Sequence, residues 1–342
     1  MALKRVTMQD IAEACGLSRN TVSKVFNDRG AVPEATKKLV LSKAQELGYY
    51  QPPEELSEAV ALNRGNIALL TQHKLMSHNF GVFFNTSFTD QISRSGYTIK
   101  IYEISSEELA EKRLPPHLKL EETAGILGIE LFDRDYLDMI CSLGIPTVFV
   151  DGYARIRREA VASDFVSMEN VTSVLELVNR MIRAGARRIG FVGDIEHCNS
   201  FYERWFAYGL ALRDAGLPLD RELCILAPDS APYGETDWLL EQLDAMPELP
   251  DAFVCANDYL AIHLMTALKK RGLRIPEDVM VAGFDGSPEA GVVEPPLTTA
   301  RIPTADIGRL AATMLINRIT APDRPFYWIY VQTSPVWGGS TR

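Results

Sequence analysis

Three polar side chains near the N-terminus have the chemistry to contact DNA. Arg19, Asn20 and Lys24 fall on one face of a predicted short helix. Their guanidinium, amide and ammonium groups carry hydrogen-bond donors that suit base edges and phosphates in the major groove. The spacing therefore favours DNA binding over the alternative, a pair of helices whose polar face is only hydrated.

Two short helices and a tight turn are predicted to hold these side chains outward. Thr7 is in the position of an N-cap, and Asp10 follows three residues later, as in a capping box. Gly16 supplies the turn, and Ser18 caps the second helix. Apolar residues at helical spacing give both helices a buried face: Ile11, Ala12, Cys15, Val22, Val25 and Phe26. Such a helix-turn-helix presents the start of its second helix to a partner.

A third helix is predicted over residues 33–47, and Gly48 ends it as a C-cap. Its apolar positions are Leu39, Val40, Ala44 and Leu47. Three helices within the first fifty residues are enough to share one small core, which makes this segment an independent head.

The net charge of the 342-residue chain is −10, which by itself argues against a nucleic-acid-binding protein. The distribution of charge changes that conclusion. Residues 1–50 hold eight Lys and Arg against five Asp and Glu, a net charge of +3, so the rest of the chain carries −13. A basic head on an acidic body is typical of a protein that contacts DNA with one end only.

Beyond a proline-containing linker at residues 51–66, the chain alternates short apolar strands with helices. This alternation predicts an α/β body of parallel sheets covered by helices on both faces. The strands are expected at residues 67–72, 97–104, 125–131, 146–152, 188–194, 224–229, 252–258 and 279–286, and helices at 133–143, 171–184 and 260–271.

Polar residues follow several of these strands directly. Asp151, Asp194, Asn257 and Asp285 stand at strand ends, where parallel sheets bind ligands. Any single one is equally well explained as a helix cap, but four together favour a ligand cleft. Asp258 is expected to cap the helix that follows it rather than to contact a ligand.

The sequence resembles the LacI/GalR family of bacterial transcription regulators. The segments VTMQDIAEACGLSRNTVSKVFN, VPEATKKLV, GIPTVFVD, FVCANDYLA and GLRIPEDVMVAGFDG carry the resemblance. It implies an all-α helix-turn-helix head and an α/β, two-lobed periplasmic-binding-protein-like regulatory domain. The implied divisions are a DNA-binding domain at 1–50, a hinge at 51–66 and an effector and dimerisation domain at 67–342, with lobe 1 at 67–164 and 304–325 and lobe 2 at 165–303 and 326–342.

The resemblance also implies roles for individual residues. The implied DNA contacts are Thr7, Met8, Ser18, Arg19, Asn20, Thr21, Ser23, Lys24, Asn27, Thr36, Tyr49 and Ala59. The implied effector contacts are Met76, His78, Asn79, Asp151, Arg204, Asn257 and Asp285. A guanidinium with carboxylates and an amide suits a sugar or a related polyol, because these groups pair with hydroxyls.

The hinge departs from the family pattern. Family members order a hinge helix on operator DNA and insert a leucine into the minor groove. The family's leucine position falls on Ala59 here, while Glu54, Glu55 and Glu58 would face phosphates. Leu62 would replace the leucine only if the helix shifted. Operator binding is therefore expected to be weaker or differently spaced than in the family.

Neither catalytic motifs nor metal-ligand spacings occur in the sequence, so no enzyme activity, cofactor or metal is expected. The five cysteines form no CxxC pair and are expected to be reduced thiols of a cytoplasmic protein. No leader or membrane span is predicted. The function expected is a homodimeric repressor with operator DNA and a sugar-like effector as partners. The alternative is a small-molecule sensor that binds operators weakly because of its atypical hinge.

Overall fold

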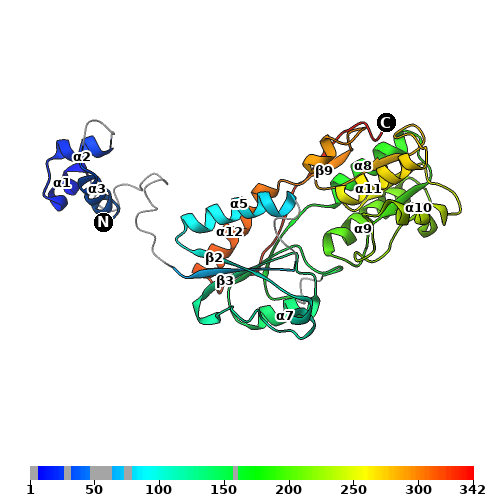
Figure 1. Ribbon diagram of the computed structural model, residues 1–342. Helices are drawn as coiled ribbons and strands as arrows, with labels where there is room; N and C mark the ends of the chain where they lie inside the picture. The colour runs from blue at the N-terminus through cyan, green and yellow to red at the C-terminus, as the bar shows by residue number, and fades with distance from the viewer. Residues whose placement is uncertain (1–6, 27–31, 47–63, 73–78, 157–160) are drawn as a thin grey trace. The chain divides into compact units, whose positions relative to one another are not determined.

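A computed structural model describes residues 7–26, 32–46, 64–72, 79–156 and 161–342 (Figure 1). The chain forms two compact units, Met1–Asn63 and Arg64–Arg342, which we call the head and the body. The predicted linker at residues 51–66 lies mostly outside the described residues.

Three helices make up the described part of the head: α1 at Met8–Cys15, α2 at Arg19–Phe26 and α3 at Glu34–Glu46. The capping box at the start of α1 is confirmed, because the Asp10 amide donates to the Thr7 hydroxyl and the Thr7 amide donates to the Asp10 carboxylate at 2.7 Å. Gly16 ends α1 with a φ of 65°, a left-handed conformation that glycine adopts without strain. The Thr21 amide donates to the Ser18 hydroxyl at 3.1 Å, as expected of an N-cap.

The head core follows the predicted helical periods. Its fully buried members are Ile11, Ala12, Val22, Val40 and Ala44. Leu39 was expected on the apolar face of the third helix, but its side chain is 44% exposed. Consecutive residues of a helix point in different directions, and Val40, not Leu39, faces the core. The side chain of Phe26 and the whole of Leu47 and Gly48 are outside what the structure describes.

Lobe 1 of the body is a six-stranded parallel sheet in the order β10-β5-β4-β3-β1-β2. The side chains of β1 alternate between its two faces, as a strand buried on both sides requires. Ile67 and Leu69 lie in the core with α5, whereas Ala68 and Leu70 lie in the core with α7. The elements are β1 Asn66–Thr71, α5 Asn79–Arg94, β2 Thr98–Glu103, α6 Ser106–Ala110, a 3-10 turn at Leu120–Glu122, β3 Thr123–Ile129, α7 Arg134–Ser142, β4 Thr147–Val150, β5 Asp164–Met168, α12 Thr304–Thr320 and β10 Trp328–Val331.

Lobe 2 contains a three-stranded parallel sheet in the order β6-β7-β8 and a short antiparallel pair, β9 with β11. The prediction of a strand at residues 224–229 is wrong, because within this segment only Ile225 forms a β-bridge, with Val192. The elements are α8 Val171–Arg183, β6 Ile189–Val192, α9 Asn199–Asp214, a 3-10 turn at Arg221–Leu223, α10 Thr236–Asp244, β7 Ala252–Cys255, α11 Asp258–Lys270, β8 Met280–Ala282, a 3-10 turn at Pro288–Gly291, β9 Thr299–Arg301 and β11 Ser334–Val336.

The chain crosses between the lobes three times, after β5, after β9 and after β10. The expected lobe boundaries at 165 and 326 need correction, because β5 and β10 belong to the sheet of lobe 1. Backbone pairing shows this directly: Val148 of β4 is opposite Asp164, and Phe165 is opposite Trp328. Both strands therefore end lobe 1 instead of beginning lobe 2.

Helix α12 is held in lobe 1 by close packing and by a buried ion pair. A Cβ atom on Gly308 would lie 2.6 Å from the Phe84 carbonyl oxygen, so only glycine permits this approach of α12 to α5. Arg318 donates through Nε and Nη2 to both carboxylate oxygens of Asp164, at 2.8 and 3.0 Å. Both side chains are almost completely buried, at 4% and 0% exposure.

None of the helices in the described ranges has the length and apolar character that crossing a membrane would require.

Candidate functional sites

A cavity of about 560 Å³ opens in the body against the carboxyl ends of strands from both lobes. Residues at the ends of β3, β4 and β5 line one side, and residues after β7 and β8 line the other. The structure brings four of the predicted effector contacts together here: Asp151, Arg204, Asn257 and Asp285. Asp194 does not line the cavity; its carboxylate accepts the backbone amides of Glu196 and Asp229 instead.

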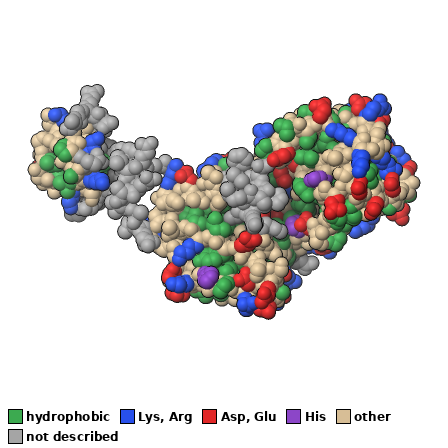
Figure 2. Space-filling model, viewed as in Figure 1, with side chains coloured by type: hydrophobic (Ala, Val, Ile, Leu, Met, Phe, Trp, Pro, Cys, Tyr) green, Lys and Arg blue, Asp and Glu red, His purple; other side chains and the backbone are tan. Residues whose placement is uncertain are grey.

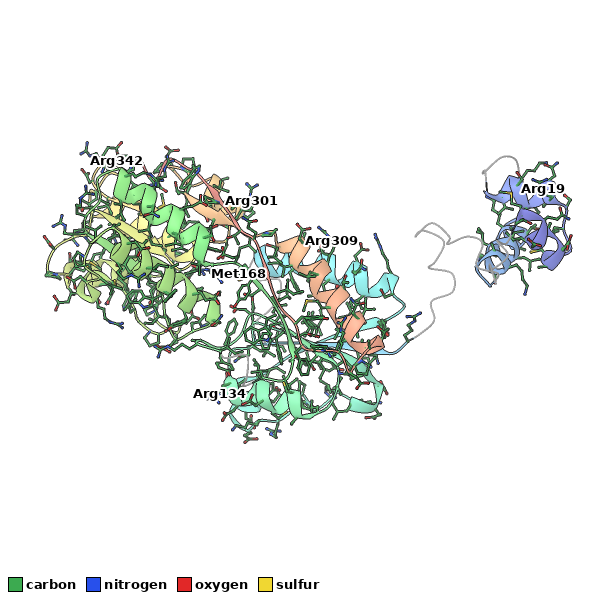
Figure 3. The ribbon with its side chains drawn as sticks, turned by 180° about the vertical axis from the view of Figure 1, so that it is seen from behind. Arg19, Arg134, Met168, Arg301, Arg309 and Arg342 are labelled. Carbon is green, nitrogen blue, oxygen red and sulfur yellow. The ribbon has the colours of Figure 1, made fainter. Side chains whose placement is uncertain are left out.

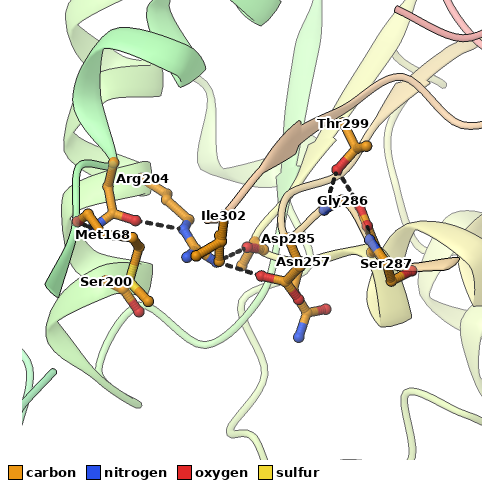
Figure 4. Close-up of polar contacts among 12 residues, drawn as sticks. Met168, Ser200, Arg204, Asn257, Asp285, Gly286, Ser287, Thr299 and Ile302 are labelled. Carbon is orange, nitrogen blue, oxygen red and sulfur yellow. Dashed lines mark hydrogen bonds and ion pairs between the residues drawn. The ribbon is translucent and has the colours of Figure 1, made fainter. Parts of the chain in front are cut away.

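Arg204 is the buried centre of this site (Figure 4). It comes from α9 and is 2% exposed. Its Nε donates to Asn170 Oδ1 at 2.9 Å, and its Nη1 donates to the Ala256 carbonyl at 2.6 Å. The guanidinium lies over the ring of Phe284, 3.7 Å from its centroid. Hydrogen bonds and stacking therefore fix the orientation of this cation before any ligand binds.

Asp285 is the charge partner of this arginine, with 3.6 Å between Arg204 Nη1 and Asp285 Oδ1. Its backbone has a φ of 124°, which a residue with a side chain rarely adopts and which is typical of functional positions. Burial raises the pKa of the Asp285 carboxyl, and the positive charge of Arg204 acts in the opposite direction.

Asp151 approaches from lobe 1, at the end of β4, and is 8% exposed. One carboxylate oxygen, Oδ2, accepts the Ser200 amide at 3.3 Å, across to the start of α9 in lobe 2. The other, Oδ1, is buried without a hydrogen-bond partner among the described residues. Burial accordingly raises the pKa of Asp151.

Asn257 both lines the cavity and caps a helix. Its Oδ1 accepts the Leu260 amide at 2.9 Å at the start of α11, which leaves the amide nitrogen for a ligand. The prediction that Asp258 caps this helix is wrong, because Asn257 does. Asp258 is buried and accepts the Ser287 amide at 2.7 Å and the Thr299 hydroxyl at 2.6 Å, and it does not line the cavity. Burial raises the pKa of Asp258 to about 6.

Several cavity residues were missed by the sequence analysis. They share no motif and come from loops or from helix starts: Glu130, Phe132, His197, Phe201, Asp229, Tyr233, Glu235 and Tyr259. His197 lies 3.7 Å from Asp229, and its ring contacts Phe132 edge-on at 4.9 Å between centroids. The Tyr233 hydroxyl donates to the Ala227 carbonyl at 2.8 Å. The loop around Tyr233 has no strand or helix periodicity, so the sequence offered no signal for it.

The remaining predicted effector contacts stay predictions. Met76 and His78 lie outside the described residues. Asn79 is the first residue of α5, and its side chain is not described.

The second candidate site is the surface of the head. Arg19, Asn20 and Lys24 are exposed on α2, and Arg19 is labelled in Figure 3. Figure 2 shows Lys and Arg side chains at several places on the visible face of the head. The other predicted contacts divide by exposure: Thr7 and Ser18 are exposed caps; Met8, Thr21, Ser23 and Thr36 are half-buried; and Asn27, Tyr49 and Ala59 are outside the described residues. Their contact with DNA stays a prediction.

No group of three His, Cys, Asp or Glu side chains within the described ranges is arranged to hold a metal ion. The five cysteines are free thiols. Burial raises the pKa of Cys198, which lines the cavity, well above its usual value, so this thiol is not a reactive nucleophile.

Protein-family models match parts of both the head and the body. A model described as "Bacterial regulatory proteins, lacI family" matches residues 7–52, and a "Periplasmic binding protein-like domain" matches residues 178–341. The match at 7–52 covers the helix-turn-helix, and the match at 178–341 covers most of lobe 2 together with α12 and β10.

Individual relatives match over nearly the whole chain. The "HTH-type transcriptional regulator CelR" of Thermobifida fusca is 29% identical over 93% of this chain and 93% of its own. The "Ribose operon repressor" of Bacillus subtilis (strain 168) is 26% identical over 92% of this chain and 91% of its own. The structure of a "transcriptional regulator CelR-cellobiose complex" has 27% identity and a TM-score of 0.72, and the match covers 98% of this chain and 100% of that one.

Proposed function

Because the chain belongs to the LacI family of DNA-binding transcriptional regulators, we propose that it is a repressor controlled by a sugar-like effector bound in the cavity of the body. The protein acts as a homodimer on operator DNA in the bacterial cytoplasm. It needs no cofactor and catalyses no reaction, as its relatives are regulators rather than enzymes.

The observation that carries the proposal is the fixed polar cluster of Arg204, Asp285 and Asn257 in a cavity large enough for a sugar. A relative of the same overall length binds cellobiose in its solved complex. Amide and carboxylate groups pair with sugar hydroxyls, and the rings of Phe201 and Tyr259 offer apolar faces for the sugar carbons.

The effector acts by biasing the angle between the lobes. Asp151 belongs to lobe 1, whereas Arg204 and Asp285 belong to lobe 2, so a ligand that bridges them favours one degree of closure. Closure changes how well the paired heads fit two half-sites, which are about one helical turn apart in such operators. The coupling is limited by the ligand's differential affinity for the two states, typically ~1–3 kcal/mol.

The test is fluorescence anisotropy with labelled duplexes from upstream of the protein's own gene. We expect one duplex to bind at least a hundredfold more tightly than a scrambled control, and a sugar from a broad panel to change that affinity. Specific binding without any response to sugars would contradict the effector part of the proposal.

The absence of specific binding would instead favour the second candidate, a sensor with weak operator binding. That candidate rests on the three glutamates, Glu54, Glu55 and Glu58, in the segment where the family inserts its hinge into DNA.

A further inference from the structure

The charges around the cavity point to the class of effector. Among the described lining residues, Arg204 is the one Lys or Arg side chain. Five lining residues carry carboxylates: Glu130, Asp151, Asp229, Glu235 and Asp285. Asp151 lies deep in the wall, while Asp229 and Glu235 are exposed at the rim. The described wall of the cavity therefore holds more acidic than basic side chains, which favours a positively charged ligand.

The single arginine is not free to bind an anion. Its Nη1 is shared between the Ala256 carbonyl and Asp285, and its Nε is bonded to Asn170. A carboxylate or phosphate that formed a bidentate pair with Arg204 would have to displace these partners. It would also be repelled by the Asp285 carboxylate. With 2% of the residue exposed, only an edge of the guanidinium is open to a ligand. Arg204 therefore donates to a hydroxyl more readily than it pairs with a new negative charge.

A positive charge, in contrast, would meet an unsatisfied acceptor. Asp151 Oδ1 has no hydrogen-bond partner among the described residues, and burial of this carboxylate is costly unless a donor or a cation compensates it. The rings of Phe201, Tyr233 and Tyr259 border the same cavity, and aromatic faces attract cations.

We propose that the cavity selects an amino sugar: a polyhydroxy ligand whose protonated amine is drawn by the carboxylates of the wall, while Arg204 and Asn257 pair with its hydroxyls. Sugars that carry a carboxylate or a phosphate are rejected. This inference rests on the proposed function, because it names the effector class of the same cavity.

The test is isothermal titration of the full-length protein with matched sugar triplets. Each triplet contains a neutral hexose, its 2-amino-2-deoxy form and its uronic acid, in the gluco, galacto and manno series. In the series that binds, we expect the amino sugar to bind about tenfold or more tightly than the neutral hexose, the magnitude that one added charge pair supplies. The uronic acid should bind about tenfold or more weakly than the neutral hexose.

Two variants locate the selectivity. Asp151→Asn should bring the ratio of amino-sugar to neutral-sugar affinity close to one, and Glu235→Gln, at the exposed rim, should lower it partly without endangering the fold. Asp237→Asn is the matched control, since Asp237 is exposed on α10, pairs with Lys270 and does not line the cavity. It removes the same charge and should leave the ratio unchanged.

The outcomes of this titration separate a failure of the inference from a failure of the proposed function. Equal affinity for amino and neutral sugars, or preference for the uronic acid, overturns the inference and leaves the proposed function standing. If no member of any triplet binds, the inference is wrong, and the proposed function is then decided separately by the broad sugar panel in the anisotropy assay.

Discussion

Arg204 links three parts of lobe 2, because one guanidinium contacts Asn170 before α8, Ala256 after β7 and Asp285 after β8. The sequence placed Arg204 in the effector site through a resemblance, and the structure adds its pairing with Asp285. No periodicity predicts that pairing, since the two residues are far apart in the chain and meet only through the strand order β6-β7-β8.

Arg204→Ala is expected to abolish the response to effector while operator binding in the absence of effector is retained. The variant removes the cation of the cavity together with its hydrogen bonds to Asn170 and Ala256, and all of these contacts lie in lobe 2. Anisotropy titrations with and without the sugar identified for the wild type measure both properties. Arg213→Ala is the control, because Arg213 lies on the same helix, is 75% exposed at its side chain and pairs with its neighbour Asp214. Loss of operator binding in Arg204→Ala would contradict the assignment of the cavity as the regulatory site.

Asp164→Ala is expected to destabilise the body by about 3–5 kcal/mol, because it leaves the buried Arg318 guanidinium without its charge partner. The Asp164 carboxylate also accepts the Tyr327 amide at 2.7 Å, so the variant leaves this donor without its acceptor as well. Urea denaturation at one fixed protein concentration measures the change. Asp90→Ala breaks the exposed pair with Arg94 and should cost about 0–1 kcal/mol. Equal effects of the two variants would show that burial does not decide the strength of these pairs.

At the scale of elements, the strands β1, β3, β4, β6, β7 and β8 could be predicted because their runs are apolar, short and bounded by turns. The segment at residues 224–229 has a similar composition but contributes only one bridge, from Ile225 to Val192, which is the last residue of β6. The cavity residues at strand ends followed from the same reasoning. Tyr233 and Glu235 did not, because tertiary packing alone brings their loop to the cavity.

The start of α2 is expected to select bases. Replacing both Arg19 and Asn20 by alanine should flatten the preference among operator variants, with each contact worth ~1–3 kcal/mol of discrimination. Lys24→Ala should instead weaken binding to all variants alike, as loss of a phosphate contact does. Competition binding against a set of singly substituted operators makes the comparison. An unchanged preference in the double variant would overturn the base-reading role.

The contact between α5 and α12 makes a separate prediction about lobe 1. Gly308→Ala places a methyl group 2.6 Å from the Phe84 carbonyl oxygen, so the helices must move apart. We expect a loss of about 1–3 kcal/mol in the free energy of unfolding, as for other overpacked cores. Thr313→Ala, on the exposed face of the same helix, should change stability little. A more stable Gly308→Ala would mean that the gain in helix propensity exceeds the steric cost.

For the whole molecule, the uneven charge predicts a steep dependence of DNA binding on salt. Residues 1–50 carry a net charge of +3 on a chain of −10, so phosphate contacts come from the heads alone. If a pair of heads makes about six phosphate contacts, affinity should fall on the order of 10³-fold between 50 and 200 mM salt. Anisotropy across a salt series should give a straight line on logarithmic axes. A flat line would contradict DNA binding through phosphate neutralisation.

The three crossings between the lobes also set an order of events during synthesis. The head lies within Met1–Asn63, is a unit of its own and is made before the body. Lobe 1 lacks α12 and β10, and lobe 2 lacks β11, until residues 304–336 have been made. The Ser340 hydroxyl, which donates to the Val281 carbonyl at 2.6 Å, joins lobe 2 later still. A nascent chain therefore carries a finished head long before it has a closed cavity or a body that can pair. Because one head makes only half the contacts of two, tight operator binding and the ability to respond to an effector arise together, once residues 304–336 have been made.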